Sequence, residues 1–231
     1  MTANKFLQTV VTAFALVGLT LGSSLAQAAT IVQPTNADES TINGGRPGSQ
    51  TIDGSGLSDA TIVQTDDPIP ATWPSHGTDS SSSMWVSSTS GGVSGQWLIL
   101  DLGQAYELSG LHQWNFNEDG FTGVGIQNVN ILFSSDSAAF SSASHSSWGD
   151  TFNTTFAEAP GSTGYTGETI NFNDAIGNRT ARYIQLDVVT NYGNSVAGLS
   201  EIRFIAVPEP SAFALLAGAF AFAWIMVRRR G

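Results

Sequence analysis

One short segment of this 231-residue chain holds several side-chain types that could recognise a small polar ligand. From His112 to Asp119 it reads His-Gln-Trp-Asn-Phe-Asn-Glu-Asp, at the end of a strand-like run. An exposed aromatic ring can stack on the apolar face of a sugar, while amides and carboxylates hydrogen-bond its hydroxyls. The candidate ligand-binding residues are therefore Trp114, Asn115, Asn117 and Glu118.

The same segment has a second interpretation. Successive side chains of a strand point to opposite faces, so Trp114 and Phe116 share one face. If that face is the core, both rings are packed inside, and Gln113, Asn115 and Asn117 form an exposed polar face. The sequence leaves both interpretations open.

Catalysis finds little support in the sequence. There is no Gly-x-Ser-x-Gly motif for a serine nucleophile and no cysteine for a thiol nucleophile or a disulfide. His76, His112 and His145 are scattered and match no zinc spacing. Carboxylate pairs of the glycosidase type could be assembled, but any acidic chain offers them. We therefore expect a protein that is not an enzyme.

The charge of the chain excludes one class of partner. Residues 29–207 contain four arginines, no lysine and 18 acidic residues, a formal net charge of −14. A polyanion offers no basic patch to nucleic acid or anionic lipid, so we expect no nucleic-acid partner. Cation binding and repulsion from other acidic surfaces are the expected consequences.

Short apolar or alternating runs, separated by Gly, Asn, Asp and Ser, recur between residues 29 and 207, and no amphipathic helix is apparent. This pattern is typical of an all-β domain. Ile184, Leu186 and Val188 fall on one face of their run, as in a sheet with one buried side. The predicted strands are Trp97–Leu102, Glu107–Phe116, Val129–Ser134, Thr169–Phe172, Tyr183–Val189 and Leu199–Ala206.

Three of these regions carry a family resemblance. Residues 96–103 read Gln-Trp-Leu-Ile-Leu-Asp-Leu-Gly, residues 181–186 read Ala-Arg-Tyr-Ile-Gln-Leu, and residues 198–204 read Gly-Leu-Ser-Glu-Ile-Arg-Phe. In this order they resemble the discoidin domain, the C-terminal type of coagulation factors five and eight, over about residues 52–205. The resemblance implies a galactose-binding-like jelly-roll β-sandwich, whose bacterial members often bind carbohydrate.

The resemblance also implies a structural calcium ion. Bacterial carbohydrate-binding members hold it with loop carbonyls, an Asp in an Asp-Gly turn and a Glu near the last strand. Asp53, followed by Gly54, and Glu201 stand at the corresponding places. Ca²⁺ takes six to eight hard oxygen ligands, which such a set suits. The alternative is that Asp53 only starts a turn and Glu201 pairs with an arginine such as Arg182.

The C-terminal segment has three parts in a fixed order. A Val-Pro-Glu-Pro motif precedes an uncharged apolar stretch, 211–227, and three arginines follow. Seventeen residues are close to the minimum of about 17 for a membrane-spanning helix, and the arginines predict a cytoplasmic C-terminus. The segment resembles the PEP-CTERM sorting signal, which implies processing by a membrane-embedded exosortase. The sorting residues are Val207, Pro208, Glu209, Pro210, Arg228, Arg229 and Arg230.

The N-terminus predicts export as well. Residues 1–28 contain one Lys, an apolar run and Ala-Gln-Ala at the end, as in a secretory signal peptide. The predicted organisation is a signal peptide (1–28), one exported domain (29–207) and a sorting signal (208–231).

Together these features predict an exported bacterial protein, first held in the inner membrane and then placed on the cell surface or in the extracellular matrix. As a binding module it would hold an extracellular polysaccharide. The alternative is an acidic structural matrix protein without a specific ligand.

Overall fold

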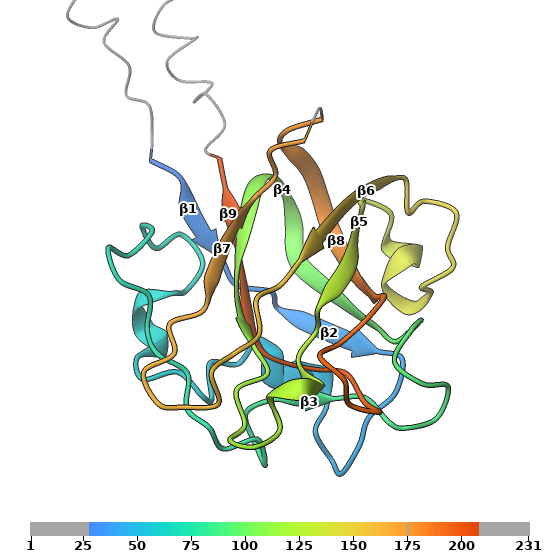
Figure 1. Cartoon of the computed structure of the whole chain (residues 1–231). Helices are drawn as coiled ribbons and strands as arrows, with labels where there is room; N and C mark the ends of the chain where they lie inside the picture. The colour runs from blue at the N-terminus through green and yellow to red at the C-terminus, as the bar shows by residue number, and fades with distance from the viewer. Residues whose placement is uncertain (1–27, 175, 208–231) are drawn as a thin grey trace, which may run out of the picture. The chain divides into compact units, whose positions relative to one another are not determined.

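Antiparallel strands and short 3₁₀ helices make up the part of the chain described by the computed structural model, residues 28–174 and 176–207 (Figure 1). The all-β prediction is confirmed. The strands are β1 (Thr30–Val32), β2 (Asn36–Glu39), β3 (Trp85–Val86), β4 (Trp97–Asn115), β5 (Asn128–Ser134), β6 (Asp150–Thr155), β7 (Glu168–Asn171), β8 (Arg179–Val188) and β9 (Gly198–Ala206). The 3₁₀ helices are η1 (Gly48–Thr51), η2 (Ala60–Ile62), η3 (Thr122–Val124) and η4 (Ser137–Ser141).

Strand β4 organises the whole sheet. It joins two of the predicted runs, and its register to β8 shifts between Asp101 and Tyr106, where Gly103 has φ +84°. Before the shift β4 pairs with β2 and β8; near its end it pairs with β7 and β9. Such an irregularity bends a strand, which lets one strand serve two parts of a sheet.

The remaining strands extend these two parts. β8 pairs with β5, and β5 pairs with β6; β9 pairs with β1 and with the short β3. Leu98 and Leu100 of β4 enter the same buried cluster as Ile202 and Phe204 of β9 and Ile184 of β8. One apolar core therefore holds both parts of the sheet together.

Strand β8 differs from the one-sided strand predicted from its alternation. Ile184, Leu186 and Val188 are buried as expected, but Tyr183 and Gln185 on the other face are buried too. Phe140 of η4 lies against Tyr183, with 6.0 Å between ring centroids. The serine-rich segment around η4 thus covers a face that was predicted to be open to solvent.

A long segment from Ile52 to Gly77 covers the outer face of β4 and β9. The indole Nε1 of Trp114 donates to the carbonyl of Pro74 (2.8 Å), and Nε of Arg203 donates to the carbonyl of Val63 (2.8 Å). Side chains that alternate away from the core are therefore enclosed.

The predicted signal peptide and sorting signal lie outside the described residues, apart from Ala28 and Val207. Within the described ranges no helix has the length and apolarity needed to cross a membrane.

Candidate functional site

Three of the four predicted ligand-binding residues are in the interior. Trp114, Asn115 and Asn117 have no exposed surface. Trp114 is enclosed by the 52–77 segment, with its indole edge-on to Trp73 at 5.7 Å between centroids. The prediction that Trp114 stacks on a sugar is wrong for this structure, because neither face of its ring is open.

The two amides hold loops together instead of facing solvent. Nδ2 of Asn115 donates to the carbonyls of Ile126 and Ala157, both at 2.8 Å. Asn117 donates to the carbonyl of Ser162 (2.9 Å), while its Oδ1 accepts from the Gly161 amide (3.0 Å). With their hydrogen bonds satisfied inside the protein, these side chains have a structural role. The alternative interpretation was right that Trp114 and Phe116 are packed inside, but its exposed polar face is wrong, because Gln113 is buried with the two amides.

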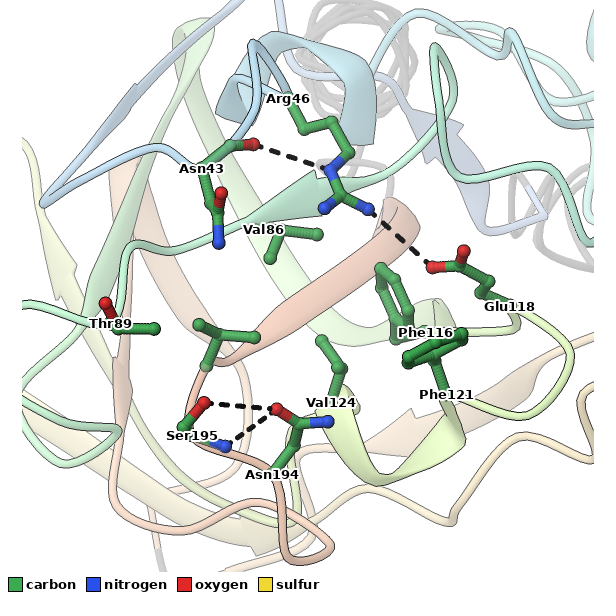
Figure 2. Close-up of a pocket in the computed structure, with 11 residues that line it drawn as sticks. Asn43, Arg46, Val86, Thr89, Phe116, Glu118, Phe121, Val124, Asn194 and Ser195 are labelled. Carbon is green, nitrogen blue, oxygen red and sulfur yellow. Dashed lines mark hydrogen bonds and ion pairs between the residues drawn. The ribbon is translucent and has the colours of Figure 1, made fainter.

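Glu118, the fourth predicted residue, lines a hollow beyond the end of β4 (Figure 2). The hollow has a volume of about 290 Å³. Its floor is a small apolar cluster separate from the main core, and its rim is polar and aromatic. The lining residues are Asn43, Arg46, Val86, Thr89, Phe116, Glu118, Phe121, Val124, Asn194, Ser195 and Val196. We call this hollow the β3 pocket.

Two charged side chains and one ring stand at the rim of the β3 pocket. Nη1 of Arg46 lies 3.6 Å from a carboxylate oxygen of Glu118, and both side chains are about a quarter exposed. Phe121, on the same loop as Glu118, keeps 54% of its surface exposed. Figure 2 shows Arg46 and Glu118 pointing toward each other beside Phe116 and Phe121. The pocket therefore offers a stacking ring beside charged hydrogen-bonding groups.

The local sequence explains how Arg46 reaches this place. Gly44 and Gly45 both adopt left-handed φ values, +62° and +73°, and the Arg46 amide donates to the Asn43 carbonyl (3.3 Å). A tight turn with two positive φ angles strongly favours glycine. Arg46 is then held by Ser80, whose hydroxyl accepts from its Nη1 at 3.0 Å. The Asn-Gly-Gly-Arg sequence of residues 43–46 is thus the signal from which this turn could have been predicted.

In this structure the carboxylates of both predicted calcium ligands, Asp53 and Glu201, accept hydrogen bonds from the protein itself. Oε2 of Glu201 accepts from the Gly54 amide (2.9 Å), and its Oε1 is bound by the guanidinium of Arg203. Oδ1 of Asp53 accepts from the Ser55 amide (2.8 Å), as in a turn. The described residues contain no group of three or more His, Cys, Asp or Glu able to hold a metal. The alternative was correct about a paired Glu201, but its partner is Arg203, whereas Arg182 pairs with Asp101.

Burial and charge act in opposite directions on the pKa of Glu201 in its pair with Arg203. Burial raises the pKa of Glu201 to about 7, and the charge of Arg203 opposes this rise. His112 on the neighbouring strand is also enclosed, and burial lowers its pKa to about 4. Its Nε2 donates to the carbonyl of Thr166 (2.8 Å), so Nδ1 accepts from the Thr169 hydroxyl (2.7 Å). Neither Glu201 nor His112 lines the β3 pocket, so we assign both a structural role.

No protein-family model and no curated protein sequence matches this chain. Among solved structures it is similar to the family 32 carbohydrate-binding module of NanJ from C. perfringens, in complex with galactose. That match has a TM-score of 0.44 and 17% identity, and covers 77% of this chain and 98% of the other.

A second similar structure is truncated AlyQ, with CBM32 and alginate lyase domains (TM-score 0.46, 18% identity, 79% of this chain and 34% of the other). A third is the fucolectin of striped bass serum, Morone saxatilis (TM-score 0.47, 13% identity, 74% and 46%). Each of these three structures is a carbohydrate-binding domain or a protein that contains one.

Proposed function

We propose that this protein is an exported, non-catalytic carbohydrate-binding module, and that it binds its ligand at the β3 pocket. The observation that carries the proposal is the exposed ring of Phe121 beside the Arg46–Glu118 pair. A pyranose can lay its apolar face on such a ring while its hydroxyls meet charged donors and acceptors. Of the four predicted ligand residues, the proposal retains Glu118 alone.

The floor of the pocket supports binding without large rearrangement. Met84, Val86, Phe116, Val124 and Val196 form a buried cluster below the rim. Because a packed floor holds the surrounding loops in place, little ordering is needed when a ligand enters. The pocket is shallow and polar-rimmed, so we expect weak affinity for a single sugar unit.

The negative charge of the domain favours neutral carbohydrates over acidic ones. In residues 28–174 and 176–207 every arginine pairs with a carboxylate, so no arginine is left to neutralise an acidic sugar. A uronate would meet Glu118 and a domain of net charge −14. We therefore propose a neutral extracellular polysaccharide as ligand. The pairs join Arg46 to Glu118, Arg179 to Asp150 and Asp174, Arg182 to Asp101, and Arg203 to Glu201.

The end segments supply the rest of the proposal. The resemblance of 207–231 to a PEP-CTERM signal supports delivery to the cell surface or matrix by an exosortase, after a stage in the inner membrane.

The single carboxylate among the lining residues of the β3 pocket is paired, which favours binding over acid–base catalysis. The second candidate function is an acidic matrix protein without a specific ligand, favoured by the net charge of −14.

A glycan array with the wild type and Phe121→Ala tests the binding site. The variant should bind up to about tenfold more weakly, because a stacking contact contributes about 0.5–1.5 kcal/mol and about 1.4 kcal/mol corresponds to tenfold in affinity. It should keep its stability, since Phe121 is more than half exposed. Ile176→Ala, which removes another exposed apolar side chain (60%), is the matched control.

Two results would reject the binding proposal. Retained binding in Phe121→Ala would move the site elsewhere on the domain. A wild type that binds no neutral or acidic polysaccharide on a broad array would favour the structural matrix role.

A further inference from the structure

The outer face of β9 contains a buried cation that belongs to the chain itself. Arg203 has no exposed surface, and neither has Glu201 two residues earlier on the same face. A charged side chain is rarely enclosed unless its partners compensate for lost hydration. The partners of Arg203 therefore indicate what it does.

The guanidinium donates to three oxygen atoms, one from the covering segment and two from β9 itself. Nε donates to the Val63 carbonyl (2.8 Å), and Nη1 donates to the Ile202 carbonyl (2.8 Å) and to the Glu201 carboxylate. One carboxylate with backbone carbonyls is the kind of oxygen set that also suits a hard metal ion. Here a single positive charge from the chain neutralises Glu201.

The segment over β9 closes around this group. The Gly54 amide donates to Glu201, and Gly54 has a φ of +75°. A Cβ at Gly54 would lie 2.6 Å from Cβ of Ala60 and 3.7 Å from Nη2 of Arg203. The guanidinium thus fills the space between β9 and the turn that follows Asp53.

We infer that Arg203 takes the place of a structural metal ion: its guanidinium fastens the 53–63 segment to β9, and the domain is stable and binds its ligand without calcium. A dication beside Glu201 would be repelled by the guanidinium and would have to displace the Gly54 amide. This segment is connected to the loops of the β3 pocket through residues 76 and 77. The Gly77 amide donates to the carbonyl of Gly56 (2.9 Å), and Asn117 donates to the carbonyls of His76 (3.2 Å) and Gly77 (3.1 Å). The pocket is thereby braced by a guanidinium and not by a metal.

The test begins with the full-length wild type. Metal analysis after purification should find no stoichiometric calcium, and melting curves in chelator and in millimolar Ca²⁺ should coincide. A ligand at about 100 times its Kd raises Tm by several degrees, which this comparison would detect. Retained calcium, or a calcium-dependent rise in Tm, would overturn the inference.

Arg203→Met then removes the charge but keeps an apolar side chain. Leaving Glu201 buried and unpaired should lower Tm by roughly 6–20 °C, from the usual effect of breaking a buried pair in a domain of this size. Arg182→Met is the matched control, because Arg182 is 38% exposed in its pair with Asp101 and should shift Tm by only a few degrees at most.

Hydrogen exchange gives a local readout. In Arg203→Met the amides of residues 53–63 should lose protection before those of β4 and β8. Unchanged protection of this segment would refute the fastening role. If Arg203→Met does not fold, the wild-type calcium measurements still decide whether a metal is present.

Discussion

His112, a buried imidazole on β4, should contribute a loss of stability in acid, whereas Glu201, whose pKa is raised to about 7, contributes in the opposite direction. The ring is 2% exposed and stacks on Trp73, with 3.8 Å between centroids and planes 9° apart. Both ring nitrogens are engaged by Thr166 and Thr169 in the neutral form. Protonation would thus charge an enclosed ring with no carboxylate partner.

The magnitude follows from the pKa values of the two states. Burial lowers the pKa of His112 from 6.5 to about 4 in the folded protein, so the unfolded chain binds the proton more readily. The stabilisation is therefore complete above pH 6.5 and is lost as the pH falls toward 4. A shift of about 2.5 units corresponds to about 3.4 kcal/mol in total, of which about 2 kcal/mol is lost by pH 5.

Urea unfolding of the wild type and of His112→Gln at pH 7.5 and pH 5 measures this effect. The wild type should lose about 2 kcal/mol more than the variant over this interval. His145→Gln, in a half-buried loop position, controls for the substitution itself. Equal pH dependence in the wild type and His112→Gln would refute the reasoning, whatever the absolute stabilities.

Three further outcomes follow from the packing and the sequence ends. Trp114→Ala should lower the free energy of unfolding by about 3–5 kcal/mol in urea, as a buried ring does; a loss of glycan binding at unchanged stability would instead place Trp114 at the ligand. Gly56→Ala should cost about 1–3 kcal/mol by the same assay, because its Cβ would lie 2.0 Å from Nε2 of His76, and an unaltered urea midpoint would contradict this contact. The mature protein should lack residues 1–28 and 228–230 by intact mass of surface-extracted material; a stable species that keeps the terminal arginines would reduce the segment to a simple anchor.

Sequence periodicity predicted the central strands and β7, but missed β1, β2, β3 and β6. Runs such as 129–134 and 183–189 are long, apolar and flanked by turn residues, so β5 and β8 were expected within a few residues. Strand β6 reads Asp-Thr-Phe-Asn-Thr-Thr and buries only Phe152. A strand that pairs at the edge of a sheet needs few apolar side chains, so its own sequence carries a weak signal.

The candidate site was harder to predict, because its residues come from loops that the sequence does not relate. Glu118 was identified from its neighbours, but Arg46 is 72 positions away and reaches it only through the folded sheet. Trp114 was misjudged because one strand cannot reveal that another segment, 52–77, covers its outer face. Phe121 was missed because a lone ring in a glycine-containing loop has no periodic pattern.

The pairing of β1 with β9 determines where the two ends of the domain lie relative to the β3 pocket. Thr30 is the register partner of Ala206, so both ends of the domain leave from one place, as the upper part of Figure 1 shows. Gly198, at the opposite end of β9, pairs with Val86 in the wall of the β3 pocket. Eight residue steps of about 3.3 Å separate the two positions by roughly 26 Å. A tether joined to either end of the described domain would therefore attach at the end of β9 that lies away from the β3 pocket, which leaves the pocket clear of the attachment point.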